Sequence, residues 1–125
     1  MSITMTILAV VACAFHLMAF VLESVLFMQP KVHKRFGART TEQAEAARLF
    51  AFNQGFYNLF LVVGCVTGML LWQAGHVAVG STLLLFTCAS MAAAGIVLLL
   101  SAPNKASAAL MQALPPALVI ILYLL

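Results

Sequence analysis

Four long apolar stretches constrain the fold of this chain more than any other feature of its sequence. They cover roughly residues 3–28, 44–73, 77–100 and 107–125. Each approaches or exceeds the ~20 residues that an α-helix needs to cross ~30 Å of hydrocarbon. Because a helix satisfies its own backbone hydrogen bonds, it is the element expected there. The stretches predict an all-α protein: a four-helix transmembrane bundle that forms a single domain over residues 1–125.

The composition excludes an ordinary soluble domain. Hydrophobic residues make up 65% of the chain and charged residues 7%, whereas soluble domains carry about 25% charged residues. Four of the six basic residues lie in one short connection between apolar stretches: Lys31, Lys34, Arg35 and Arg39. Charge gathered in this way indicates membrane topology rather than nucleic-acid binding. The bilayer is therefore the expected partner, and no nucleic acid is expected.

The same charges predict an orientation. With four spans, the connection at residues 29–42 and the one at 101–107 lie on one side of the membrane, and the second adds Lys105. By the positive-inside rule this side is cytoplasmic, so both termini are expected on the outer side.

Local signals predict where two of the helices end and begin. Pro30 has no backbone N–H and disfavours helix at the preceding residue, so the first span should stop before it. Gly37 suits a turn in the basic connection. Thr40 or Thr41 can cap the second span, with Gln43 in capping-box spacing from Thr40.

Small residues within the spans have structural interpretations. Cys13, Cys65 and Cys88 each lie in an apolar stretch, where cysteine behaves as a small hydrophobe, so we expect neither a disulfide nor a metal site. Gly64 and Gly68 form a small-xxx-small pair that lets helices approach closely. That approach can occur within the chain or in a homo-oligomer.

Polar side chains inside the spans mark the candidate site. They are His16 and Glu23 in the first span, Asn53, Gln54, Tyr57 and Asn58 in the second, and Gln112 in the fourth. An unpaired amide in hydrocarbon costs several kcal/mol, so each group needs a partner on a helix, in water or in a ligand. At ~1.5 Å per residue these groups converge in the cytoplasmic half of the bundle. We therefore predict an interior site that opens toward the cytoplasm.

His16 and Glu23 are the candidate catalytic residues. They lie seven residues apart and thus on one helix face, and an ionisable pair at this depth indicates a functional site. A carboxylate in a membrane pairs, reaches water or takes up a proton, so a purely structural Glu23 is the alternative. A histidine bonded to a neighbouring helix is the alternative for His16.

The remaining polar groups are candidate ligand-binding residues. As interhelical bonds they would contribute only ~0.6 kcal/mol each, and Gln112 could instead satisfy carbonyls freed by Pro115. The helical wheel predicts that Asn53, Gln54 and Asn58 face the bundle interior, with Gly55 on the remaining side.

These residues carry a resemblance. His16, Glu23, the Asn-Gln-Gly-x-Tyr-Asn run at residues 53–58, and Gln112 with Pro115 resemble a family of small bacterial four-span proteins catalogued only as a domain of unknown function. Leu59 stands where a glycine is frequent in that family. The resemblance implies four helices and a multi-pass protein of the plasma (inner) membrane. It implies no activity.

A weaker similarity concerns the small four-span haem-containing isomerases that rearrange epoxides. They also place a short polar run with an asparagine in one span, and a histidine on that run holds the iron. Here Asn53 and Gln54 occupy the run, and the one intramembrane histidine, His16, lies on another span. Haem would therefore need a different arrangement, and it is a minority interpretation of an unknown cofactor.

Three functions from different classes follow. The first is an intramembrane site that binds or acts on a small, largely apolar molecule, with protons exchanged by Glu23 and His16. The second is a structural or accessory oligomeric protein that uses the polar groups to lock its helices. The third is a proton-coupled small-molecule exporter. No nucleophile triad, metal-ligand spacing or nucleotide motif assigns a reaction, so the enzyme question is open.

Overall fold

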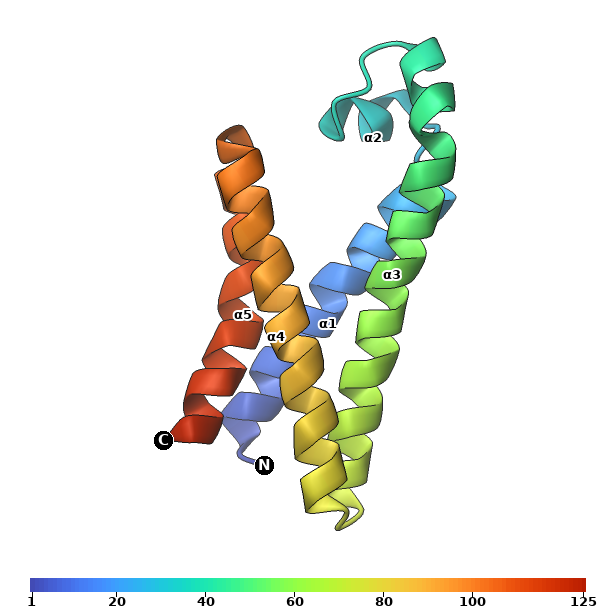
Figure 1. Ribbon diagram of the computed structural model, residues 1–125. Helices are drawn as coiled ribbons and strands as arrows, with labels where there is room; N and C mark the ends of the chain where they lie inside the picture. Colours follow the sequence, from blue (N-terminus) through green and yellow to red (C-terminus); the bar gives the residue numbers. More distant parts are fainter. The chain divides into compact units, whose positions relative to one another are not determined.

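The computed structural model describes all 125 residues and is all-helical (Figure 1). Its elements are α1 (Ile3–Phe20), the π-helical turn η1 (Val21–Val25), α2 (Pro30–Arg35), α3 (Thr41–Gln73), α4 (Val77–Ser101), the 3₁₀ turn η2 (Pro103–Lys105) and α5 (Ala106–Leu124). Four helical segments are long and apolar enough to cross a membrane: Ile3–Val25, Thr41–Gln73, Val77–Ser101 and Pro103–Leu124. The predicted all-α fold with four membrane-spanning helices is confirmed, and the chain is a multi-pass membrane protein.

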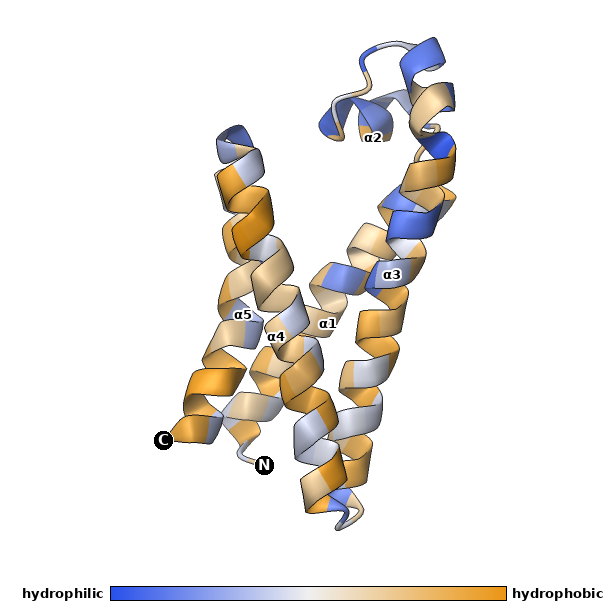
Figure 2. Ribbon diagram, in the orientation of Figure 1, coloured by the Kyte–Doolittle hydropathy of each residue, from blue (hydrophilic) through white to orange (hydrophobic).

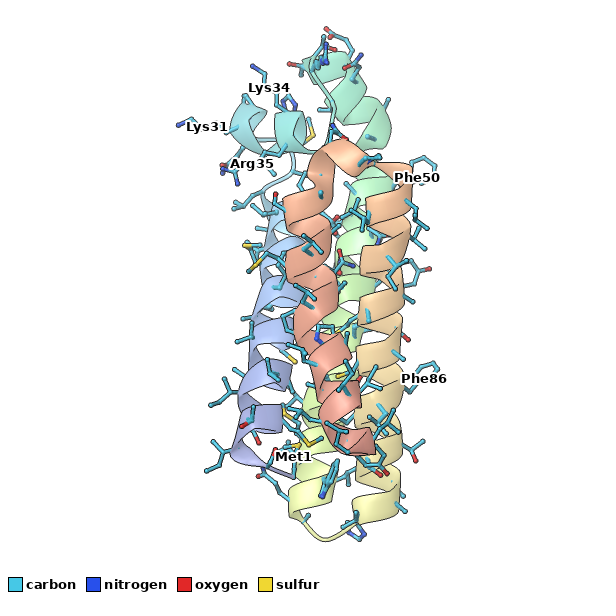
Figure 3. All side chains as sticks on the ribbon, turned by 90° about the vertical axis from the view of Figure 1, so that its left-hand side faces the viewer. Met1, Lys31, Lys34, Arg35, Phe50 and Phe86 are labelled. Atoms are coloured by element: carbon cyan, nitrogen blue, oxygen red, sulfur yellow. The ribbon has the colours of Figure 1, made fainter.

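The surface of the helices suits a bilayer. Apolar residues run along α4 and α5, whereas hydrophilic residues gather on α2 and the first turns of α3 (Figure 2). Large apolar side chains project outward from the helices, among them Phe50, 77% exposed, and Phe86, 68% exposed (Figure 3). In water such exposure would be costly, and in a membrane these side chains contact lipid.

The predicted start of α3 is confirmed by its capping contacts. The backbone N–H of Gln43 donates to Thr40 Oγ1 at 3.2 Å, and Gln43 Oε1 accepts in return from the N–H of Thr40 at 3.4 Å, and also from that of Arg39 at 2.7 Å. This reciprocal pairing is a capping box. Two turns contain glycine with positive φ, +95° at Gly37 and +91° at Gly75, a conformation that glycine adopts without strain.

The first span differs from its prediction in how it ends. Its helix ends at Val25 rather than near residue 28, because the N–H of Leu26 donates to the carbonyl of Val21 at 2.9 Å and closes a wide π turn. Pro30 does not precede a loop but is the first residue of α2. Proline suits that position, since an N–H at the start of a helix has no intrahelical partner.

The chain forms two compact units that share α1 and α3. The first unit comprises residues 1–16 and 61–125, and the second comprises residues 17–60. The core of the first unit is built from small and flexible apolar residues: Met5, Ala9, Ala12, Cys13, Cys65, Met69, Leu84, Cys88, Met91 and Val119. Small residues in this core let the helices of the unit approach closely.

Glycines set the closest helix approach in the first unit. A Cβ placed on Gly68 would lie 2.7 Å from the backbone N of Leu84, and one on Gly64 would lie 2.7 Å from Thr87 Cγ2. α4 therefore covers both glycines. Both glycines thus serve packing within the chain, which is one of the two roles that the sequence left open.

α4 and α5 pack side by side along their length (Figure 1). Gly95 permits this, since a Cβ there would lie 2.7 Å from Ala113 Cβ and 2.9 Å from the carbonyl of Ala109. At the other end of α5, the rings of Tyr123 and Trp72 meet edge to face at 5.8 Å. Tyr123 thus joins the end of α5 to the end of α3.

All three cysteines of the chain meet in the first unit, although they come from three different spans. Cys13, Cys65 and Cys88 are free and buried, and all three belong to the apolar core of this unit. Their burial agrees with the interpretation of these cysteines as small hydrophobes.

The second unit packs α2 against the ends of its neighbours. Its core contains Phe27, Ala38 and Ala44. His33 Nδ1 lies 2.6 Å from the carbonyl oxygen of Ala38, and the rings of Phe27 and Phe36 lie 5.9 Å apart. The basic connection is therefore an ordered helix-turn and not an extended loop.

Candidate functional site

The site of the second unit is built on the π turn at the end of the first span. Glu23 and Ser24 lie within η1. A π turn widens the helix by one residue per turn and changes the direction in which the following side chains project. Such turns often occur at functional sites. Here the turn determines which side chains meet α3.

Glu23 is held by Asn58 of α3. Asn58 Nδ2 donates to Glu23 Oε2 at 2.9 Å and to the carbonyl of Gln54 at 3.1 Å. Asn58 is buried, with 8% of its surface exposed. Glu23 Oε1 makes no hydrogen bond to the protein. One carboxyl oxygen of Glu23 is thus bonded to α3.

A second contact joins the same elements. Ser24 Oγ donates to the carbonyl of Phe52 at 2.8 Å. Gly55 lies against this turn, since a Cβ there would overlap Ser24 Oγ and lie 3.0 Å from Ser24 N and 3.1 Å from the carbonyl of Phe20. The prediction that Gly55 lies away from the packed face is therefore wrong. Its missing side chain is what lets α3 approach η1.

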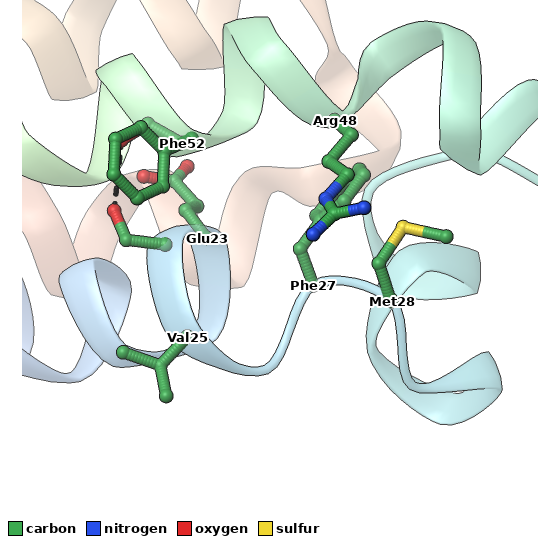
Figure 4. Close-up of a pocket in the computed structure, with 7 residues that line it drawn as sticks. Glu23, Val25, Phe27, Met28, Arg48 and Phe52 are labelled. Atoms are coloured by element: carbon green, nitrogen blue, oxygen red, sulfur yellow. Dashed lines mark hydrogen bonds between the residues drawn. The ribbon is translucent and has the colours of Figure 1, made fainter.

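Beside these contacts lies a pocket of about 240 Å³ (Figure 4). Its lining residues are Glu23, Ser24, Val25, Phe27, Met28, Arg48 and Phe52. Most of this lining is apolar, with one carboxyl, one hydroxyl and one guanidinium group. Arg48 is 65% exposed and lies 3.8 Å from Glu45, so part of its charge is compensated by a residue outside the pocket.

The other predicted residues of α3 take different positions. Asn53 is exposed and its Nδ2 donates to the carbonyl of Leu49 at 2.9 Å, within its own helix. Gln54 is exposed, and Tyr57 is 64% exposed. Within the second unit, Glu23 and Asn58 are the predicted residues that the fold brings together.

His16 and Gln112 belong to the first unit. His16 is buried, 1% exposed, with its ring 5.8 Å from that of Phe15. Gln112 is half-buried on α5, three residues before Pro115. Neither is among the residues that line the pocket.

Sequence reasoning missed two residues of the site. Ser24 follows Glu23 directly, and its hydroxyl inside an apolar span was a signal of the same kind as the amides. Arg48 lies near the start of the second span and was not among the candidate site residues. Both Ser24 and Arg48 line the pocket with Glu23, and Arg48 lies toward Phe27 and Met28 (Figure 4).

Comparison with known proteins adds one finding. The family model described as "Protein of unknown function (DUF1304)" matches residues 9–124. No curated protein and no solved structure matches the chain significantly. The expected membership in a family of unknown function is confirmed, and any function has to be argued from the site.

Proposed function

We propose a binding function for this chain, which belongs to the DUF1304 family of proteins of unknown function. The protein holds a small, largely apolar molecule in the pocket beside Glu23, with the polar end of that molecule bonded to Glu23 Oε1. The observation that carries the proposal is that the two carboxyl oxygens of Glu23 differ in their hydrogen bonding. Asn58 fixes Oε2, and Oε1 is left for a ligand.

The lining of the pocket supports this chemistry. Small-molecule sites are mostly apolar with a few placed polar groups. Val25, Phe27, Met28 and Phe52 supply apolar surface, and Glu23 and Ser24 supply polar atoms. At about 240 Å³ the cavity is smaller than the ~300–1,000 Å³ of drug-sized sites. The ligand is accordingly small.

The polar end of the ligand is a hydrogen-bond donor. An ionised carboxylate accepts hydrogen bonds and donates none, so it selects an ammonium, amide or hydroxyl group. An ammonium gains most, because it adds charge to the hydrogen bond. The aromatic faces of Phe27 and Phe52 suit the same group. A small aromatic or aliphatic amine is the simplest fit.

The basic residues of the connection at residues 29–42 support a cytoplasmic position for the side of the protein that carries the pocket. The protein then lies in the plasma membrane with both termini outside. Single cysteines replacing Lys34 and Gly75 in a cysteine-free background test that orientation. In sealed cells an impermeant maleimide should label the cysteine at position 75 and not that at position 34. The opposite labelling would reverse the orientation.

Binding is tested with three probes of similar size on the reconstituted full chain: 2-phenylethylamine, 3-phenylpropanoate and 3-phenylpropanol. Equilibrium dialysis should show the amine binding at least tenfold tighter than the carboxylate. Glu23→Gln should remove that tenfold difference, equivalent to ~1.4 kcal/mol. Glu42→Gln is the matched control, because Glu42 is exposed, lies outside the pocket lining and is not paired with Arg48, and it should bind all three probes as the native protein does. Equal binding of the probes, or no effect of Glu23→Gln, would refute the site.

A structural role is the second candidate, and the direct bond between Asn58 and Glu23 favours it. In that case the two side chains only join the end of the first span to α3. Replacing both by apolar residues would then be tolerated, since a buried polar pair can often be exchanged for well-packed hydrophobic groups. Stability measurements on variants of Glu23 and Asn58 separate the binding role from the structural role.

A further inference from the structure

The short helix α2 has two faces of opposite character. Lys31, Lys34 and Arg35 stand at spacings of three and four residues, which places them on one side of the helix. All three are exposed and point away from the helices (Figure 3). Val32 and His33 are buried, with 7% and 3% of their surfaces exposed. We call Lys31, Lys34 and Arg35 the basic face.

The basic face is held in place by the rest of the second unit. Pro30 fixes the first backbone angle of α2. The contact of His33 Nδ1 with the carbonyl oxygen of Ala38, at 2.6 Å, closes the turn after the helix. Phe27 and Phe36 pack ring against ring across α2. The three cations are thus displayed by an ordered element, which lowers the entropy lost when they bind a partner.

The protein does not neutralise these charges. The chain has only three acidic residues, namely Glu23, Glu42 and Glu45, and its one ion pair joins Glu45 to Arg48. Like charges at these spacings on a helix repel each other. A partner that supplies negative charge would therefore stabilise α2.

The place of α2 in the chain identifies that partner. The first span ends at Val25 and α2 begins at Pro30, so only the short segment at residues 26–29 separates the basic face from the hydrocarbon region. At that level the groups of a bilayer that carry negative charge are lipid phosphates. Basic clusters directly beside a transmembrane helix attract anionic lipids, by ~1 kcal/mol for each Lys or Arg.

We propose that the basic face of α2 binds the headgroup of an anionic phospholipid of the surrounding bilayer. The guanidinium of Arg35 can bond two phosphate oxygens at once, and the ammonium groups of Lys31 and Lys34 add point charges beside it. This site is separate from the proposed function, because its residues do not line the pocket.

Electron paramagnetic resonance with spin-labelled lipids tests this site. The full chain is reconstituted in phosphatidylcholine vesicles that contain trace spin-labelled phosphatidylglycerol or trace spin-labelled phosphatidylcholine. The protein-restricted fraction should favour phosphatidylglycerol at least about fivefold, the preference that ~1 kcal/mol from a single cation already provides. In the triple variant Lys31→Gln, Lys34→Gln, Arg35→Gln the preference should fall to one. Vesicles of symmetrical composition make the result independent of the orientation of the protein.

Two controls test whether the preference for phosphatidylglycerol comes from the charge of the basic face and not from any positive charge on the protein. The charge-preserving variant Lys31→Arg, Lys34→Arg, Arg35→Lys and the variant Lys105→Gln, which changes a cation of another turn, should both keep the native preference. Should the triple variant fail to fold, raising the ionic strength on the native protein replaces it, because screening should abolish a surface headgroup contact. Inorganic phosphate at millimolar concentration should not compete, since the headgroup is concentrated in the membrane. A native protein without preference, a triple variant that keeps it, or competition by free phosphate would each overturn the proposal.

Discussion

Replacing Asn58 by Leu is expected to lower the free energy of unfolding by about 2–3 kcal/mol, because the half-buried carboxyl group of Glu23 then loses its donor. Asn58 Nδ2 bonds both Glu23 Oε2 and the carbonyl of Gln54, and Leu satisfies neither. Unfolding of the purified protein by a denaturing detergent measures the change. Asn53→Leu is the matched control on the same helix, since Asn53 is exposed and bonds only within its helix. It should change stability by less than about 0.5 kcal/mol.

A double-mutant cycle tests whether Asn58 stabilises the protein through its hydrogen bond to Glu23. Glu23→Leu should reduce the cost of Asn58→Leu, because the group that needed the donor has gone. In the proposed binding site Glu23→Gln keeps most of the stability while it loses the selectivity for amines, since Gln preserves shape and hydrogen bonding but carries no charge. Additive losses in the cycle would show that the pair is not coupled. Unchanged stability in the Glu23→Leu, Asn58→Leu variant, together with unchanged probe binding, would leave only the structural role.

Gly55→Ala is expected to destabilise the contact between α3 and η1 by about 2 kcal/mol, within the range found for overpacked cores. The added Cβ would overlap Ser24 Oγ, and two of its nearest atoms belong to backbone, at 3.0 Å and 3.1 Å. Backbone atoms of a helix cannot rotate away, so the two helices must separate. The better helix propensity of alanine offsets up to about 1 kcal/mol of the cost.

The clash at Gly55 can be tested by partial rescue. Ser24→Ala removes the overlapping hydroxyl but also the hydrogen bond to the carbonyl of Phe52. The Gly55→Ala, Ser24→Ala variant should therefore be more stable than the sum of the two single changes predicts. Detergent unfolding of all three variants provides the comparison. A neutral Gly55→Ala would mean that α3 does not approach η1 as closely as the geometry shows.

Features governed by local chemistry were predictable from the sequence. The four spans follow from length and hydropathy, and the capping box of α3 follows from the spacing of Thr40 and Gln43. Glu23 and Asn58 were both selected because polar groups in hydrocarbon need partners. Their direct pairing depends on the helix register at η1. The sequence Val-Leu-Glu-Ser-Val contains neither a proline nor a glycine that would indicate a π turn.

One prediction was incomplete and one was wrong. The first span stops before Pro30 as predicted, but proline at the first helical position also begins a helix, and the start of α2 at Pro30 was not predicted. Gly55 was placed on the side of the helix that its polar neighbours left over. In the structure it is buried, since only a residue without a side chain fits against Ser24. A partner distant in the sequence decided its position.

Labelling by a hydrophobic carbodiimide tests most directly whether Glu23 forms an accessible site. At mildly acidic pH the reagent adds to a protonated carboxyl group, and the adduct rearranges to a stable N-acylurea that peptide mass spectrometry locates. We predict that Glu23 is the main labelled residue, ahead of the water-exposed Glu42 and Glu45. A chain labelled at Glu42 or Glu45 but not at Glu23 would contradict an open pocket beside this carboxyl group.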